Sequence, residues 1–183
     1  ERVHIVSSLA DIAKNTRLVF FLGGQRNIKA ILRQAGNVLD GSHQVVHANH
    51  FLYGSRLETT SALIRRLTGC LQIGAIAGPV HVGELLAGQA NAVVVGSPFP
   101  ALVTKVKSLF PQPELRIYQS DDLVGVEVGA ALVQLIAVAV GVSDGLGLGA
   151  ATHATLMVRG LAEVARIGER LGGSPETFAG LSG

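Results

Sequence analysis

The feature that most restricts the fold is an alternation of short apolar runs with helix-like segments through the first two-thirds of the 183 residues. Leu18–Leu22, for example, is a continuous apolar run that ends at Gly23-Gly24, which is typical of a strand buried on both faces. This alternation predicts a mainly parallel sheet covered by helices. The expected strands cover residues 3–6, 18–22, 44–48, 71–76, 92–95 and 115–118; the expected helices begin at Ser8 and cover residues 25–35, 57–67 and 100–109.

The pattern changes at Ser120, which two acidic residues follow. A serine can cap the first turn of a helix, and acids there favour the positive end of the helix dipole. Long helices are expected over residues 120–142 and 152–171, with a short one after the second. The expected fold class is therefore α/β plus all-α: an incomplete Rossmann-like domain over residues 1–119, followed by an all-helical domain over residues 120–183.

Composition excludes several classes of protein. Hydrophobic residues make up 48% of the chain and charged residues 15%, which excludes intrinsic disorder. A single cysteine, Cys70, excludes a disulfide framework within the chain and fits a reducing compartment, so we expect a cytoplasmic protein. The net charge is only +2 and no basic arm is present, so we expect no nucleic-acid partner.

The longest apolar run, Val124–Val142, is nearly long enough to span a bilayer. Glu127 near one end, Gln134 in the middle and the glycines of this run fit a buried helix better. We therefore expect no stable membrane insertion.

Short motifs give little direct evidence of chemistry. A dinucleotide-binding Gly-x-Gly-x-x-Gly turn after a strand is missing, and the glycines of Gly145–Gly149 are expected to form a turn between two helices. On a strand, His43 and His47 share one face while His50 points to the other, so we expect no metal site. His153 matches no chemical signature and is expected at the surface.

Several segments nevertheless carry a family pattern. The chain reads Gly-Val-Glu-Val-Gly-Ala-Ala-Leu at 125–132, Ser-Asp-Gly-Leu-Gly-Leu-Gly at 143–149, Arg-Gly-Leu-Ala-Glu at 159–163 and Pro-Glu-Thr-Phe-Ala-Gly-Leu-Ser-Gly at 175–183. These segments resemble NAD(P)-dependent sn-glycerol-3-phosphate dehydrogenases of the bacterial type. Upstream, Gly78-Pro79 falls where that family has Gly-Pro-Ser-Phe-Ala-Lys-Glu, and Asn49-His50 falls where it has Thr-Lys-Gly-Leu.

The resemblance implies an oxidoreductase of glycerophospholipid metabolism that interconverts dihydroxyacetone phosphate and sn-glycerol 3-phosphate. It implies NAD or NADP as cofactor and a small phosphorylated substrate as partner. His50 and Gly78 are the expected substrate-binding positions, and Gly23, Gly24 and Val82 are the expected cofactor-binding positions.

This chain departs from the family pattern at the positions that carry the family's catalytic and substrate-binding residues. The family's catalytic lysine is Val133 here, and its substrate-contacting lysine is His50. Arg159 is the remaining candidate cation in the helical motifs, because no lysine follows Lys107. The family's glycine loop is also absent before Glu1.

A hydride reduction needs a positioned acid, and valine cannot donate a proton. We therefore expect a family member with impaired catalysis. Two alternatives stay open: a non-catalytic scaffold, dimerisation or ligand-sensing module, and an altered enzyme that uses His50 as the acid.

A homo-oligomer is expected on topological grounds. In a doubly wound sheet the first strand lies in the middle, so its absence would leave a bare strand edge. Bare edges favour pairing with another strand, so we expect either further N-terminal residues or an oligomer to cover this edge.

Overall fold

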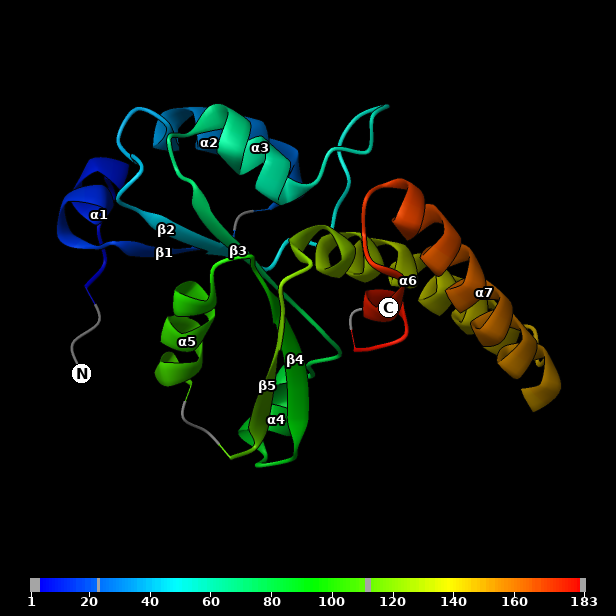
Figure 1. Cartoon of the computed structure of the whole chain (residues 1–183). Helices are drawn as coiled ribbons and strands as arrows, with labels where there is room; N and C mark the ends of the chain where they lie inside the picture. Colours follow the sequence, from blue (N-terminus) through cyan, green and yellow to red (C-terminus); the bar gives the residue numbers. More distant parts are fainter. Residues whose placement is uncertain (1–3, 23, 111–112, 182–183) are drawn as a thin grey trace.

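The computed structural model describes residues 4–22, 24–110 and 113–181. Its centre is a sheet of five strands, which are β1 (Leu18–Phe21), β2 (Gln44–His47), β3 (Gln72–Ala77), β4 (Asn91–Gly96) and β5 (Leu115–Ser120) (Figure 1). The strands lie in sequence order across the sheet. Neighbouring strands pair in parallel except for β3 and β4, which are antiparallel. The predicted mainly parallel sheet is thus confirmed, with one reversal in its middle.

Helices cover both faces of this sheet (Figure 1). Neighbouring residues of β2 illustrate the division, since Val45 belongs to one hydrophobic core and Val46 to the other. The Val45 core also contains residues from two helices that follow the first strands, and Cys70 is fully buried in it. Of the helices in this part of the chain, α2 and α3 contribute to the Val45 core and α5 contributes to the Val46 core. The helical elements are α1 (Leu9–Asn15), a 3-10 turn (Gln25–Asn27), α2 (Ile28–Ala35), α3 (Thr60–Leu67), α4 (Val82–Leu86) and α5 (Pro100–Leu109).

The last part of the described chain is helical, as predicted. It consists of α6 (Leu123–Gly145), α7 (Ala150–Arg170) and α8 (Pro175–Phe178). α6 and α7 form an antiparallel hairpin that extends beyond the sheet (Figure 1). The turn between them contains Gly147 at φ +68°, a left-handed conformation that glycine adopts without strain.

The first part of α6 lies directly on the sheet. Leu123, Val126 and Ala130 are buried in the same core as β3. A side chain at Gly96 of β4 would come within 2.8 Å of the Val126 Cβ, so this glycine permits the close contact. By length and composition α6 is the one described helix apolar enough to cross a membrane, but its first part is occupied by the core contacts.

Three sequence-based expectations for individual elements were wrong. A strand was expected at residues 3–6, but residues 4–6 form no strand. Residue 3 lies outside the described part of the chain. β1 is an edge strand that is only half-buried, because it has a paired neighbour on one side. The N-cap of α6 is Asp122, whose carboxylate accepts from the Gly125 N–H at 2.8 Å, while Ser120 still belongs to β5.

Candidate functional site

The structure brings three of the sequence-predicted residues to one pocket of about 280 Å³: His50, Gly78 and Val133. Two long-range features of the fold create it. β2 and β3 are parallel, so the residues that follow them meet at one edge of the sheet. α6 starts at the opposite edge, where β5 ends, and crosses the sheet face to close the pocket. The lining residues are His50, Gly78, Pro79, Ala130, Val133, Gln134, Gly180 and Leu181.

Gly78 occupies a position that other residues would strain. Its φ is +137°, and a Cβ there would lie 2.9 Å from the Ala92 carbonyl oxygen of β4. The absence of a side chain therefore allows the chain leaving β3 to pass close to β4 and form one wall of the pocket.

His50 is half-buried and its orientation is fixed by a backbone contact. The ring Nε2 lies 3.2 Å from the Ile76 carbonyl oxygen. Because a carbonyl only accepts hydrogen bonds, Nε2 carries the proton in this contact. In the neutral ring, Nδ1 is then the nitrogen that retains a lone pair.

The remaining predicted site residues lie elsewhere. Arg159 lines a separate, mostly apolar groove of about 430 Å³ between α6 and α7. Gly24 is exposed, and Val82 at the start of α4 is 67% exposed; neither lines the pocket of His50. Gly23 lies outside the described residues.

A buried polar cluster beside this pocket was not predicted from the sequence. Glu127 of α6 accepts a hydrogen bond of 2.8 Å from the Ser61 N–H at the start of α3, and another from the Ser61 hydroxyl. His47 Nε2 lies 3.1 Å from Glu127 Oε1, and the two side chains are 0% and 2% exposed. Among the described residues, His47 Nε2 has no hydrogen-bond partner. The cluster joins β2, α3 and α6.

The sequence offered only partial signals for this cluster. A glutamate inside an apolar run indicates that its side chain has a buried polar partner, and a histidine at a strand end indicates a polar environment there. Neither pattern shows that these two residues contact each other. Tyr53 lies near the same carboxylate, and burial, followed by the Glu127 charge, raises the pKa of its phenol.

His153, which was predicted at the surface, is partly exposed. Its side chain is 26% exposed, and its Nε2 lies 3.0 Å from Asp144 Oδ1 across the turn of the α6–α7 hairpin. The three histidines considered for metal binding have separate partners: His43 contacts Asp40 and the Ala13 carbonyl, His47 contacts Glu127, and His50 contacts Ile76.

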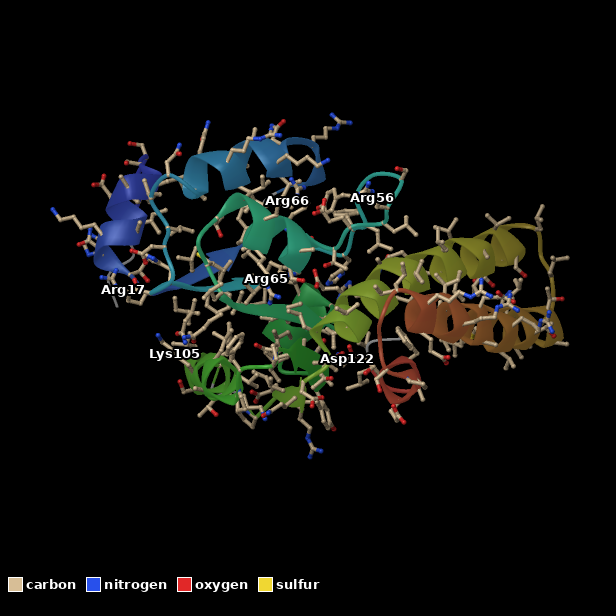
Figure 2. All side chains as sticks on the ribbon, turned by 45° about the horizontal axis from the view of Figure 1, so that its top comes forward. Arg17, Arg56, Arg65, Arg66, Lys105 and Asp122 are labelled. Carbon is tan, nitrogen blue, oxygen red and sulfur yellow. The ribbon has the colours of Figure 1, made fainter. Side chains whose placement is uncertain are left out.

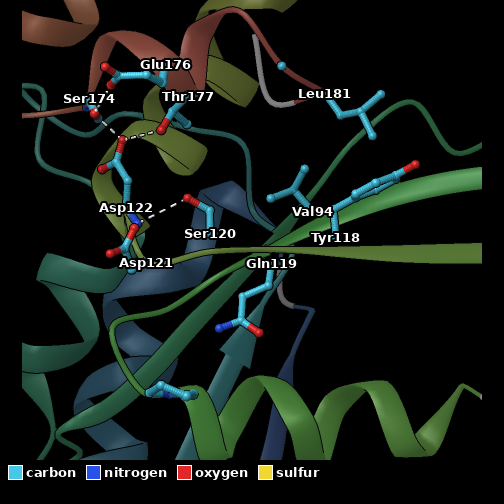
Figure 3. Close-up of a pocket in the computed structure, with 12 residues that line it drawn as sticks. Val94, Tyr118, Gln119, Ser120, Asp121, Asp122, Ser174, Glu176, Thr177 and Leu181 are labelled. Carbon is cyan, nitrogen blue, oxygen red and sulfur yellow. Dashed lines mark hydrogen bonds between the residues drawn. The ribbon is translucent and has the colours of Figure 1, made fainter.

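Another hollow, of about 1090 Å³, lies between β5 and α8 and shares Gly180 and Leu181 with the pocket of His50 (Figure 3). Its polar lining includes Asp121, Asp122 and Glu176. Asp122 Oδ2 accepts from the Ser174 N–H and the Thr177 hydroxyl, each at 2.7 Å, so this carboxylate already serves to join α6 to α8.

Cations are concentrated on the sheet-containing part of the molecule. Residues 1–120 contain 12 Lys and Arg against 6 Asp and Glu, whereas residues 121–183 contain 3 Arg against 7 acids. Figure 2 labels five of the cations of the first part, and α7 carries the three arginines of the second; the labelled cations are Arg17, Arg56, Arg65, Arg66 and Lys105. No lysine or arginine is among the lining residues of the His50 pocket.

Comparisons with known proteins agree with this arrangement. The model of the NAD-dependent glycerol-3-phosphate dehydrogenase C-terminus matches residues 122–183. The protein named glycerol-3-phosphate dehydrogenase (NAD(P)+) from Ralstonia nicotianae is 39% identical over 185 residues, covering 99% of this chain and 50% of the relative. The protein of that name from Geobacter sulfurreducens is 36% identical over 182 residues, covering 97% and 54%. The chain thus spans about half the length of these curated relatives.

Solved structures show the same fold. A glycerol-3-phosphate dehydrogenase from Coxiella burnetii matches with a TM-score of 0.89 at 24% identity, covering 96% of this chain and 54% of that one. One from Saccharomyces cerevisiae matches with a TM-score of 0.84 at 21% identity, with coverages of 96% and 54%.

The mixed sheet and the helix that crosses it therefore have the fold of these solved structures, in which a Rossmann-type sheet is joined to a helical region. The chain belongs to the NAD(P)-dependent glycerol-3-phosphate dehydrogenase family.

Proposed function

We propose that this chain is a catalytically impaired member of its family, which binds a small molecule but does not reduce dihydroxyacetone phosphate at an enzymatic rate. The observation that carries the proposal is Val133, a hydrocarbon side chain that lines the same pocket as His50 and Gly78. The family resemblance assigns a catalytic lysine to this position. A positioned acid contributes roughly 10²–10⁴-fold to the rate of such a reaction.

A nicotinamide cofactor receives little support from the described residues. A dinucleotide needs backbone N–H groups that converge on its pyrophosphate, commonly at a glycine-rich turn. The expected cofactor positions Gly24 and Val82 are exposed and outside the pocket. These residues do not by themselves fit a dinucleotide, and binding of NAD or NADP stays a prediction from the names of the relatives.

A direct assay tests the proposal. The chain is mixed with NADH or NADPH and dihydroxyacetone phosphate, and the loss of reduced cofactor is followed by absorbance. We expect no turnover above the background rate. Turnover of about 1 s⁻¹ or more would be ordinary for an enzyme and would contradict impaired catalysis.

A matched pair of variants assigns the cause. Val133→Lys restores a proton donor in the pocket, whereas Val138→Lys adds the same side chain to the same helix at a position that is 65% exposed and outside the pocket. Turnover gained only by Val133→Lys would identify the missing donor as the defect. Equal gains in both variants would exclude a specific role for position 133.

A second candidate is an altered enzyme in which His50 is the acid. It is supported by the presence of His50 in the pocket that holds Val133. If the native chain shows turnover, His50→Gln should abolish it together with the pH dependence of the rate. Turnover with an unchanged pH profile in that variant would exclude this candidate.

Homo-oligomerisation and a cytoplasmic location are further parts of the proposal. The exposed edge of β1 and several exposed apolar side chains on the hairpin, including Leu135 and Val138, support self-association. Sedimentation of a single 19.0 kDa species at all concentrations would contradict an oligomer.

A further inference from the structure

The end of β2 buries a histidine close to the residue that lines the pocket. His47 is the last residue of β2 and is 1% exposed. It does not line the pocket itself, but the chain leaving it leads directly to His50, which does. The contacts of the His47 ring therefore act on the short turn that carries His50 to the pocket.

One ring nitrogen of His47 holds this turn. Its Nδ1 accepts a buried hydrogen bond of 3.3 Å from the Asn49 N–H. Because a backbone N–H only donates, Nδ1 carries no proton in this contact. The neutral ring then carries its proton on Nε2, and a doubly protonated ring could not hold Asn49 in this way.

The other ring nitrogen faces a fixed carboxylate. His47 Nε2 lies 3.1 Å from Glu127 Oε1, and both side chains are buried. The proton on Nε2 carries a positive partial charge, so the carboxylate attracts this edge of the ring in surroundings of low dielectric constant. Glu127 is itself held by the Ser61 N–H of α3 at 2.8 Å. Turning the ring over would place C–H groups at both contacts, so the two neighbours together select one orientation of the ring.

The same carboxylate belongs to the helix of the other pocket wall. Glu127 and Val133 both lie on α6, and Val133 lines the pocket with His50. The helix backbone fixes Val133 relative to Glu127, while the His47 ring relates the turn of His50 to that carboxylate. The two walls thus share one buried reference point.

We propose that His47 is a positioning residue: its ring, oriented by Glu127, holds the turn at Asn49 and so sets the place of His50 in the pocket. The inference deepens the proposed function, because His50 is the acid of its second candidate. It concerns the geometry of the pocket and needs no turnover. An NMR test of it can therefore fail while the assay with reduced cofactor supports impaired catalysis, and the reverse.

The first test uses the native, isotopically labelled chain at about pH 8, where an ordinary histidine ring is neutral. The nitrogen signals of the His47 ring distinguish its two neutral forms. We expect the form with the proton on Nε2, together with slow hydrogen exchange at the Asn49 amide. A ring with its proton on Nδ1, or a doubly protonated ring, would overturn the proposal.

A pair of variants separates the two nitrogens. His47→Asn places an acceptor near the position of Nδ1, whereas His47→Gln places its amide near the position of Nε2 and leaves Asn49 without an acceptor. In the Gln variant we expect the Asn49 amide to exchange at least roughly tenfold faster relative to the other amides of β2. We also expect the ring signals of His50 to move towards those of His81, whose side chain is 73% exposed. In the Asn variant both readouts should stay close to their native values.

A neighbouring substitution controls for a general loss of stability. Val46→Ala truncates a fully buried side chain of the same strand, which packs in the core of α5, on the face of the sheet opposite to His47. It should leave the His50 ring signals unchanged. The same shift of His50 in this variant, or equal changes in the Asn and Gln variants, would reduce His47 to a packing role and overturn the proposal. If a His47 variant does not fold, the measurement on the native chain decides.

Discussion

At the scale of single residues, the buried Glu127 side chain should contribute strongly to the stability of the fold. Its buried carboxyl group satisfies the Ser61 N–H and hydroxyl and faces His47. Glu127→Ala leaves these groups buried without a partner, so we expect the free energy of unfolding to fall by about 3 kcal/mol in urea denaturation. Glu127→Gln should cost less, since its amide oxygen can still accept from Ser61.

An exposed glutamate provides the control for this prediction. Glu84 on α4 has a side chain that is 54% exposed and lies 4.0 Å from the His81 ring. Glu84→Ala should change the free energy of unfolding by no more than about 0.5 kcal/mol. A similar loss in both variants would mean that the Glu127 cluster contributes nothing specific.

Asp40 provides a prediction about how the stability of the fold changes at low pH. Hydrogen bonds from the Ser42 side chain and backbone, with a contribution from His43, lower the pKa of its carboxyl group to about 2. A carboxylate with a lowered pKa in the folded state stabilises the protein above the ordinary carboxyl range and loses that effect as the pH falls. Asp40→Asn should therefore lower the urea midpoint at pH 7, and its difference from the native chain should narrow between about pH 4 and pH 2. A difference that stays constant over this range would refute the role of ionised Asp40.

The residue scale also shows how far the sequence could predict the site. His50, Gly78 and Val133 were found from short motifs, because each lies within a few residues of a strand end or a family pattern. The Glu127–Ser61 contact joins residues 66 positions apart, and a sequence pattern carries no information about such a pairing. Arg159 was grouped with the site by its motif, but the turn of α7 directs it to another groove.

At the scale of elements, Asp122 holds two helices together. One carboxylate oxygen caps α6 through Gly125, and the other accepts from Ser174 and Thr177 at the start of α8 (Figure 3). Asp122→Ala removes an N-cap worth about 1 kcal/mol and two further hydrogen bonds to a charged group. We expect a total loss of about 3 kcal/mol, measured by urea denaturation, with faster amide exchange in α8.

The neighbouring Asp121 is the matched control. It is exposed, and in the described structure its side chain has no hydrogen bond in common with the Asp122 set. Asp121→Ala should leave both the urea midpoint and the exchange in α8 close to those of the native chain. Loss of α8 protection in the Asp121 variant would contradict the special position of Asp122.

Local sequence patterns predicted the helices and strands themselves more accurately than they predicted the arrangement of these elements. α5 has the predicted bounds because Pro100 fits the first turn of a helix and the apolar spacing is regular. The antiparallel β3–β4 pair could not be predicted, since an apolar run indicates a strand but not its direction. Asp122 rather than Ser120 caps α6 because β5 continues through Ser120 to pair with Gly96.

At the scale of the whole molecule, the expected division into residues 1–119 and 120–183 can be tested by separation. Leu123, Val126 and Ala130 are buried against the sheet rather than within the helical part. A fragment of residues 120–183 would expose them to water, so we expect no cooperative thermal transition in its circular dichroism. Cooperative unfolding of the fragment, like that expected of the full chain, would favour two independent domains.

The reversal between β3 and β4 has a mechanical consequence. Because it turns β5 around, α6 starts at one rim of the sheet and reaches the opposite rim about eleven residues later, a span of roughly 16 Å. One continuous helix, packed on the strands through Leu123, Val126 and Ala130, therefore fixes the separation between the Asp122 cap at one rim and Val133 at the other.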